Sequence, residues 1–107
     1  MKVINYKIDY HPEIENDIYD GYEWYELQEQ GLGEKLRLQI RKKIAEIVAM
    51  PEAFSVKSNK LYREAKVDKF PYTIAYKIFV RKHIIFISSI KHQKKHPNKR
   101  YRKRNIT

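Results

Sequence analysis

Two neighbouring stretches of the chain read KFPYTIAYKIFV, residues 69–80, and IIFISSIKH, residues 84–92. Both are dense in β-branched and aromatic residues, and only Arg81, Lys82 and His83 separate them. This pattern predicts two strands joined by a short hairpin. The second stretch is apolar at every position from Ile84 to Ile87, which favours a place inside the sheet over an edge. The first alternates, and its expected core face holds Tyr72, Ile74, Tyr76, Ile78 and Val80.

The residues upstream predict a strand followed by a helical hairpin. Residues 3–10 alternate apolar and polar side chains, as a strand with one buried face does. The first helix is expected to begin at Pro12 and to end at Gly31 and Gly33, and the second to cover Glu34–Met50. So short a connection predicts antiparallel helices. The expected apolar positions are Ile14, Ile18, Tyr22, Trp24, Tyr25 and Leu27, then Leu36, Ile40, Ile44, Ile47 and Val48.

Between the helices and the hairpin we expect a loop over residues 51–60 and a short strand over Leu61–Lys66. The order of elements is then a strand, two helices and three strands. Because strands joined by short turns pair antiparallel, it predicts an α+β fold. We expect a twisted, mainly antiparallel sheet with both helices on one face and the other face open for function. Residues 1–98 form the expected domain, and residues 99–107 a basic tail.

Composition limits what this domain can be. A length of 107 residues and a hydrophobic content of 42% suit one compact domain. With no cysteine, the chain has no disulfide, thiolate zinc site or cysteine nucleophile. We find neither a secretory signal nor an apolar run of membrane-spanning length, and we expect a soluble cytoplasmic protein that does not contact a membrane.

The net charge of +10 is concentrated in the last third of the chain. Residues 1–68 hold 11 Lys and Arg and all 13 Asp and Glu, whereas residues 69–107 hold 12 Lys and Arg and no acid. Such an asymmetry indicates a surface for nucleic acid, a ribonucleoprotein or an acidic protein. The alternative is a tail that only keeps the protein soluble.

A set of motifs along this order of elements resembles the RelE/ParE superfamily of bacterial toxins. The set comprises Met50-Pro51 at the end of the second helix, Tyr62-Arg63 in the short strand, Phe70-Pro71-Tyr72 at the hairpin, and IKHQKKHP at residues 90–97. The resemblance covers about residues 3–100. It implies the toxin of a type II toxin–antitoxin pair, held inactive by an antitoxin protein. RelE-like members cleave mRNA on the ribosome without a metal, and ParE-like members inhibit DNA gyrase.

Two residues are candidates for metal-free RNA cleavage, which needs proton transfer and a cation for the phosphorane charge. By resemblance, Arg63 matches the strand arginine of the family and would stabilise that charge. His92 falls where some ribonuclease members carry a catalytic histidine, a residue type that can exchange protons near neutral pH. The alternatives are structural: Arg63 pairs with Glu64 or Asp68, and His92 is a hydrogen-bonded residue at a strand end.

Further cationic and aromatic side chains near the end of the chain are expected to contact phosphates or to stack on bases. They are Arg81, Lys91, Lys94, Lys95, His96, Arg100 and Tyr101. The histidines form no close ligand pair backed by acids, so we expect no metal and no cofactor. On sequence alone we prefer ribosome-dependent mRNA cleavage. Inhibition of gyrase by protein contact and a non-toxic RNA-binding domain are the alternatives.

Overall fold

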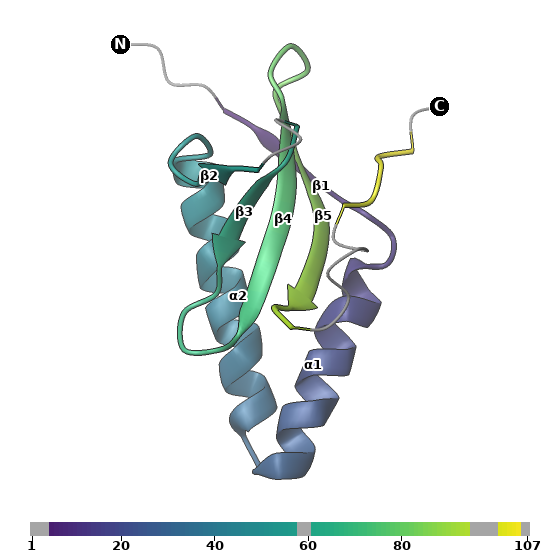
Figure 1. Ribbon diagram of the computed structural model, residues 1–107, viewed down its shortest axis with the longest axis vertical. Helices are drawn as coiled ribbons and strands as arrows, with labels where there is room; N and C mark the ends of the chain where they lie inside the picture. The colour runs from purple at the N-terminus through teal and green to yellow at the C-terminus, as the bar shows by residue number, and fades with distance from the viewer. Residues whose placement is uncertain (1–4, 58–60, 95–100, 106–107) are drawn as a thin grey trace.

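The computed structural model describes residues 5–57, 61–94 and 101–105 of the chain. The elements follow one another as a strand, a helical hairpin and four strands (Figure 1). Within these ranges neither helix is long and apolar enough to cross a membrane. The bounds are β1 Lys7–Tyr10, α1 Ile14–Gln28, α2 Leu32–Ala49, β2 Ser55–Val56, β3 Arg63–Lys66, β4 Tyr72–Phe79 and β5 Ile84–His92.

The strands form one sheet in the order β1-β5-β4-β3-β2. β1 pairs with β5 in parallel, and the other neighbours are antiparallel. The prediction of an α+β fold with a mainly antiparallel sheet is therefore confirmed, as is the position of β5 inside the sheet. β2 is an addition, because Ser55–Val56 lies in the stretch expected to be a loop. Two residues are too short for a periodicity in sequence to reveal a strand.

Both helices pack on one face of the sheet and bury an apolar core there (Figure 1). The β-branched residues of the hairpin strands contribute to this core. Removal of their apolar surface from water drives the packing of the helices on the sheet. The core residues are Ile14, Leu36, Ile40, Ile47, Ala65, Val67, Tyr72, Ile74, Tyr76, Ile85, Ile87 and Ile90. Three expected core positions are wrong: Trp24 is 52%, Leu27 77% and Val80 58% exposed. Trp24 and Leu27 lie off the helical stripe of Ile14, Ile18 and Tyr25 that packs on the core, and Val80 follows the last residue of β4.

The two helices approach closely at their connection. Gly31 has a φ of 91°, a left-handed conformation that suits glycine, and α2 begins directly after it, two residues earlier than expected. A Cβ on Gly33 would lie 2.5 Å from the carbonyl oxygen of Tyr22, so only glycine fits there. The Gly33 amide donates to the Glu26 carboxylate at 2.9 Å, which satisfies one free amide at the start of α2.

A β-bulge interrupts the pairing of β4 with β5. Ala75 pairs with Ser89, but the next residue, Tyr76, pairs with Ile87, which leaves Ser88 without an opposite residue. The core side chains of β5 are therefore Ile85, Ile87 and Ile90, with a step of three across the bulge. The bulge places the Ser88 side chain on the face away from the helices, where it contacts the C-terminal tail.

Candidate functional site

Arg63 lies on β3 and binds backbone carbonyls just before the edge strand β2. Its guanidinium donates to the carbonyl oxygen of Phe54 at 2.7 Å and to that of Glu52 at 3.2 Å. Opposite Arg63 on β4, the Tyr76 hydroxyl donates to the Pro51 carbonyl. Burial raises the pKa of Tyr76 to about 12, against the opposing effect of the Arg63 charge, so this phenol stays protonated. Arg63 and Tyr76 thus hold the segment after α2 against β3 and β4.

His92 ends β5 at the other end of the sheet. It pairs with Tyr72, and the two rings contact edge to face at 5.5 Å between centroids. Its Nδ1 accepts a hydrogen bond from the Lys94 amide at 3.1 Å. The imidazole borders a cavity of about 270 Å³, whose other lining residues are Asp17, Asp20, Trp24, Tyr72, Ile90 and Lys91.

The register places Arg63 and His92 far apart. Arg63 pairs with Tyr76 on one side of β4, and His92 pairs with Tyr72 on the other side. With strands about 4.8 Å apart and about 3.3 Å per residue, their Cα atoms are separated by roughly 16 Å. The Arg63 guanidinium is also held by the Phe54 and Glu52 carbonyls, whereas the His92 ring contacts Tyr72, so the two side chains engage different parts of the sheet. The fold therefore does not bring the two predicted catalytic residues together.

The other predicted phosphate contacts are dispersed. Arg81 lies in the β4–β5 turn, at the end of the hairpin away from His92. Lys94 is exposed just beyond β5, whereas the Lys91 ammonium lies 2.9 Å from Asp17 Oδ1 and is mostly buried. Lys95, His96 and Arg100 lie outside the described residues. The part of the chain that the structure describes contains no group of three His, Cys, Asp or Glu residues that would hold a metal ion.

The sheet face away from the helices is covered by residues 101–105, which we call the tail, so the expectation of an open face is wrong. The Tyr101 ring stacks on Tyr62 with centroids 4.9 Å apart, and its hydroxyl donates to the Glu64 carboxylate. Farther along the tail, Arg104 donates to the Asp9 carboxylate of β1 and lies over the Phe79 ring. Figure 1 shows this yellow segment beside β1 and β5.

Arg102 is the central residue of the tail. Its amide donates to Ser88 Oγ at 2.6 Å, and its carbonyl accepts from the Ser88 and Tyr62 hydroxyls at 2.9 and 3.0 Å. The guanidinium binds the two carboxylate oxygens of Asp17 at 2.8 Å each. β1 stops opposite Ile87, so the edge of β5 is open beyond it and the side chain reaches round to α1.

Asp17 is a buried carboxylate with four polar contacts, and we did not single it out from the sequence. Its side chain is only 2% exposed, and the Ile90 amide also donates to it at 2.9 Å. Burial acts to raise the pKa of Asp17, but the hydrogen bonds from Arg102, Ile90 and Lys91 outweigh it and hold that pKa below its usual value. One signal was visible: Asp17 falls on the apolar side of α1, between Ile14 and Gly21.

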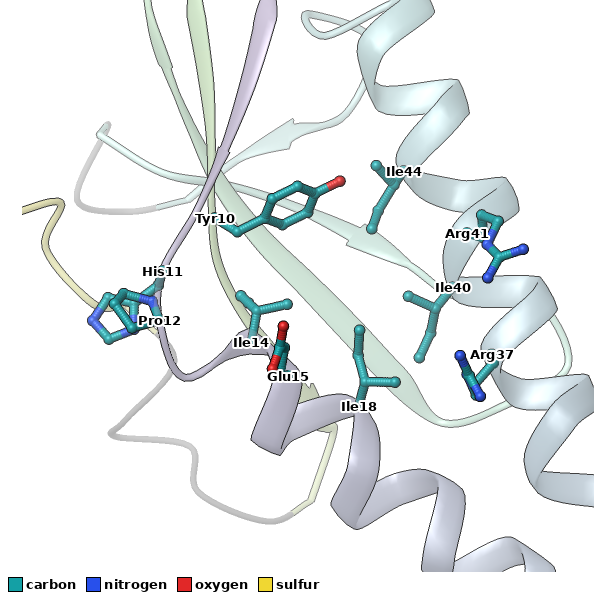
Figure 2. A pocket seen from close by; sticks show the side chains of 10 residues that line it. All are labelled: Tyr10, His11, Pro12, Ile14, Glu15, Ile18, Arg37, Ile40, Arg41 and Ile44. Atoms are coloured by element: carbon teal, nitrogen blue, oxygen red, sulfur yellow. The ribbon is translucent and has the colours of Figure 1, made fainter.

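A groove separates the first half of α1 from α2 (Figure 2). Figure 2 shows four isoleucines from the two helices pointing toward one another across it: Ile14, Ile18, Ile40 and Ile44. Arg37 and Arg41 stand on its α2 side, and Tyr10 closes the end beside β1. Its volume is about 470 Å³. An apolar floor beside two guanidinium groups suits an amphipathic segment that carries acids.

Comparison with solved structures defines the class of protein to which this fold belongs. A chain of the chromosomal ParDE toxin–antitoxin system from P. aeruginosa superposes with a TM-score of 0.72 at 14% identity, over 84% of this chain and 98% of that one. The free E. coli RelE toxin, as a double mutant, gives 0.63 at 20% identity over 84% and 85%. The same toxin bound to a RelB antitoxin peptide gives 0.58 at 22% identity over 80% and 81%. The fold is that of the RelE/ParE toxins.

The family follows from the sequence itself. Residues 8–97 match the family described as the ParE toxin of the type II toxin–antitoxin system parDE. The chain therefore belongs to the ParE toxin family and is the toxin of a type II toxin–antitoxin system. No curated protein matches it in sequence.

Proposed function

We propose that this toxin arrests growth by binding and inhibiting DNA gyrase, without cutting RNA. The observation that carries the proposal is that Arg63 and His92 engage different parts of the sheet: the guanidinium binds the Phe54 and Glu52 carbonyls, and the His92 ring contacts Tyr72 at the other end. Metal-free cleavage concentrates a base, a cation and an acid on one phosphate. An inhibitor that acts through its surface needs no such cluster, and membership of the ParE family supports this target.

The proposal includes a cognate antitoxin whose binding site is the groove between α1 and α2. The isoleucine floor matches the apolar face of an amphipathic helix, and Arg37 and Arg41 match acids on its flanks. An antitoxin seated there would bury Ile18 and Ile44, which the sheet covers only partly. In a related system, a RelB antitoxin peptide binds E. coli RelE.

A second candidate is ribosome-dependent cleavage of mRNA, which the sequence alone favoured. His92 borders a cavity beside Lys91 and Asp20, and a histidine there has the proton-transfer chemistry that cleavage requires. The last third of the chain contains no acid, and its cations would bind phosphates of the ribosome or of its message. This candidate needs Arg63 to leave the Phe54 and Glu52 carbonyls, or another cation at the scissile phosphate.

Two assays on purified full-length toxin separate the candidates. One measures plasmid supercoiling by gyrase, and the other measures primer extension on a defined mRNA in reconstituted translation, with and without ribosomes. We expect the wild type and His92→Ala to inhibit supercoiling equally and to leave the message intact. Ribosome-dependent cuts that His92→Ala abolishes would overturn the gyrase proposal. A chain that binds RNA but does not arrest growth would establish the RNA-binding alternative.

A further inference from the structure

Three residues form a socket that holds Arg102 by nearly all of its polar groups. Asp17 binds the guanidinium, while Ser88 and Tyr62 bind the backbone amide and carbonyl. The three come from α1, from β5 and from the residue before β3, so only the folded domain assembles them. We call them the Arg102 socket. Recognition of both backbone and side chain is how a protein binds a peptide ligand, and here the ligand is a segment of the same chain.

The tail is held mainly by polar contacts and stands apart from the apolar core. Its anchors are the ion pairs of Arg102 with Asp17 and of Arg104 with Asp9, together with hydrogen bonds. The aromatic contact among these anchors is the stack of Tyr101 on Tyr62. Among the described residues, the apolar core contains none of the tail. Because the core forms without it, the tail can detach while the helices and sheet remain folded.

In the docked position the tail covers one face of the sheet, and its own arginines are held in ion pairs. Beneath it Ser88 is fully buried and Tyr62 is 7% exposed. Arg102 and Lys91 share the Asp17 carboxylate, and both side chains are mostly buried. A partner that binds this face must first displace the tail. An acidic partner gains the Arg104 guanidinium, which leaves Asp9 when the tail detaches.

We infer that the tail is an autoinhibitory latch, closed when Arg102 sits in its socket and open when the toxin binds an acidic surface of its target. This inference deepens the proposed function and rests on it where the target is concerned. The latch itself depends only on the contacts of the tail. Opening it exposes the sheet face and frees the Arg104 guanidinium from Asp9, a cation that both socket variants retain.

The test uses the full-length toxin and three variants. Arg102→Gln removes the charge that binds Asp17 and leaves a buried carboxylate without its guanidinium. The double variant Asp17→Asn/Arg102→Gln avoids this, because it replaces both charged groups with uncharged side chains that can hydrogen-bond to each other. Lys103→Gln is the matched control, because Lys103 is an exposed neighbour in the same tail. The first measurement is the rate of limited trypsin cleavage after Arg104, followed by mass spectrometry. The second is the expression level at which each variant arrests growth.

We expect both socket variants to be cleaved after Arg104 about tenfold faster than the wild type, since a bidentate charge-assisted contact is the strongest tie of the tail. We also expect them to arrest growth at a lower expression level, with Lys103→Gln like the wild type in both measurements. Equal cleavage rates in all four proteins would overturn the latch. So would faster cleavage with unchanged or weaker growth arrest, which would make the tail part of the target-binding surface.

The proposed target is judged separately, by gyrase supercoiling with the same proteins. If no variant inhibits supercoiling, yet the socket variants still arrest growth at lower expression, the gyrase proposal fails and the latch stands. If Arg102→Gln alone is unfolded by circular dichroism, the uncharged double variant decides. Its fold should persist, because the two introduced amide side chains would keep hydrogen-bonding groups in the socket.

Discussion

The two faces of the sheet are covered by different means. On one face, α1 and α2 bury an apolar core in which Leu36, Ile47 and Ile74 are fully buried. On the other face, the tail is fixed by the Arg102 socket and by the ion pair of Arg104 with Asp9. The first cover is non-directional and is created by apolar burial. The second depends on a few directional contacts between charged groups.

This difference indicates which face can change. Apolar packing responds little to salt or pH, and removing part of it destabilises the whole domain. Charged contacts weaken when salt screens them or when a carboxylate is protonated. The helix face is thus the permanent framework of the toxin, and the tail face is the part that conditions or a partner can open.

The largest effect is expected from a cavity in the helix face. Leu36→Ala should lower the free energy of unfolding by about 3–5 kcal/mol, because it removes a fully buried side chain from between α1 and β4. Urea denaturation at neutral pH measures the loss. The control is Leu38→Ala, which removes a half-exposed leucine from the same helix and should cost about 1 kcal/mol or less. Equal losses in the two variants would contradict the assignment of the core.

Removing the buried carboxylate should come next. Asp17→Ala should cost about 2–4 kcal/mol, because it leaves Arg102 and Lys91 without their shared anion. Those two side chains are 19% and 18% exposed, so both regain some hydration and the cost stays below that of a fully buried pair. Urea denaturation again measures it, with Asp20→Ala, exposed on the same helix, as the control. A loss below that of Asp20→Ala would show that the socket contributes nothing to stability.

The helix face could be predicted from the sequence because its apolar residues recur at regular spacing. Leu36, Ile40 and Ile47 recur at helical spacing, and Tyr72, Ile74 and Tyr76 recur at strand spacing, so the buried face of each element was evident. The bulge at Ser88 was not, because an extra residue breaks a period of two without leaving any mark in composition. Trp24 was misplaced because it lies beside the helical stripe of Ile14, Ile18 and Tyr25 and not on it.

The tail face could not be predicted, because its contacts join residues that are far apart in sequence. Asp17 and Arg102 are 85 positions apart, and nothing local to either residue identifies the other. The surplus of cations after residue 68 was evident from the sequence. Charge alone does not show whether those cations pair with acids of the same chain or with acids of a partner. The proposed roles of Arg63 and His92 came from a family resemblance, which gives no distance between the two residues. The register of the strands places them at different ends of the sheet.

Acid should open the tail face selectively. The folded-state pKa of Asp17 is lowered, so its ionised form contributes stability that is fully present above its unfolded pKa of about 3.9 and is lost as pH falls through the folded value. The difference in unfolding free energy between wild type and Asp17→Asn should therefore be constant from pH 7 to about pH 5 and shrink below about pH 4, by at most about 1.4 kcal/mol per pH unit. Denaturant titrations across this range measure it. A difference that persists unchanged into strong acid would mean that the carboxylate is not the stabilising group.

The smallest effect is expected at the outer anchor of the tail, where Arg104 binds Asp9. The Asp9 side chain is 43% exposed, in contrast to 2% for Asp17. Asp9→Asn should cost only about 0.5 kcal/mol at low salt, as half-exposed ion pairs do. It removes the charge but keeps Arg104 over the Phe79 ring, so it isolates the ion pair from the cation–π contact.

Salt should separate the two anchors of the tail. At 1 M salt the screening length is about 3 Å, so the cost of Asp9→Asn should vanish, whereas the cost of Asp17→Asn should largely remain because its carboxylate is shielded from solvent. Trypsin cleavage after Arg104, compared at low and high salt in both variants, measures this. If high salt released the tail as fully as Asp17→Asn does, the Arg102 socket would be no stronger than a surface ion pair. Retention of the tail at high salt would show that it is held mainly by the contact of Arg102 with Asp17, a charged group that is also buried.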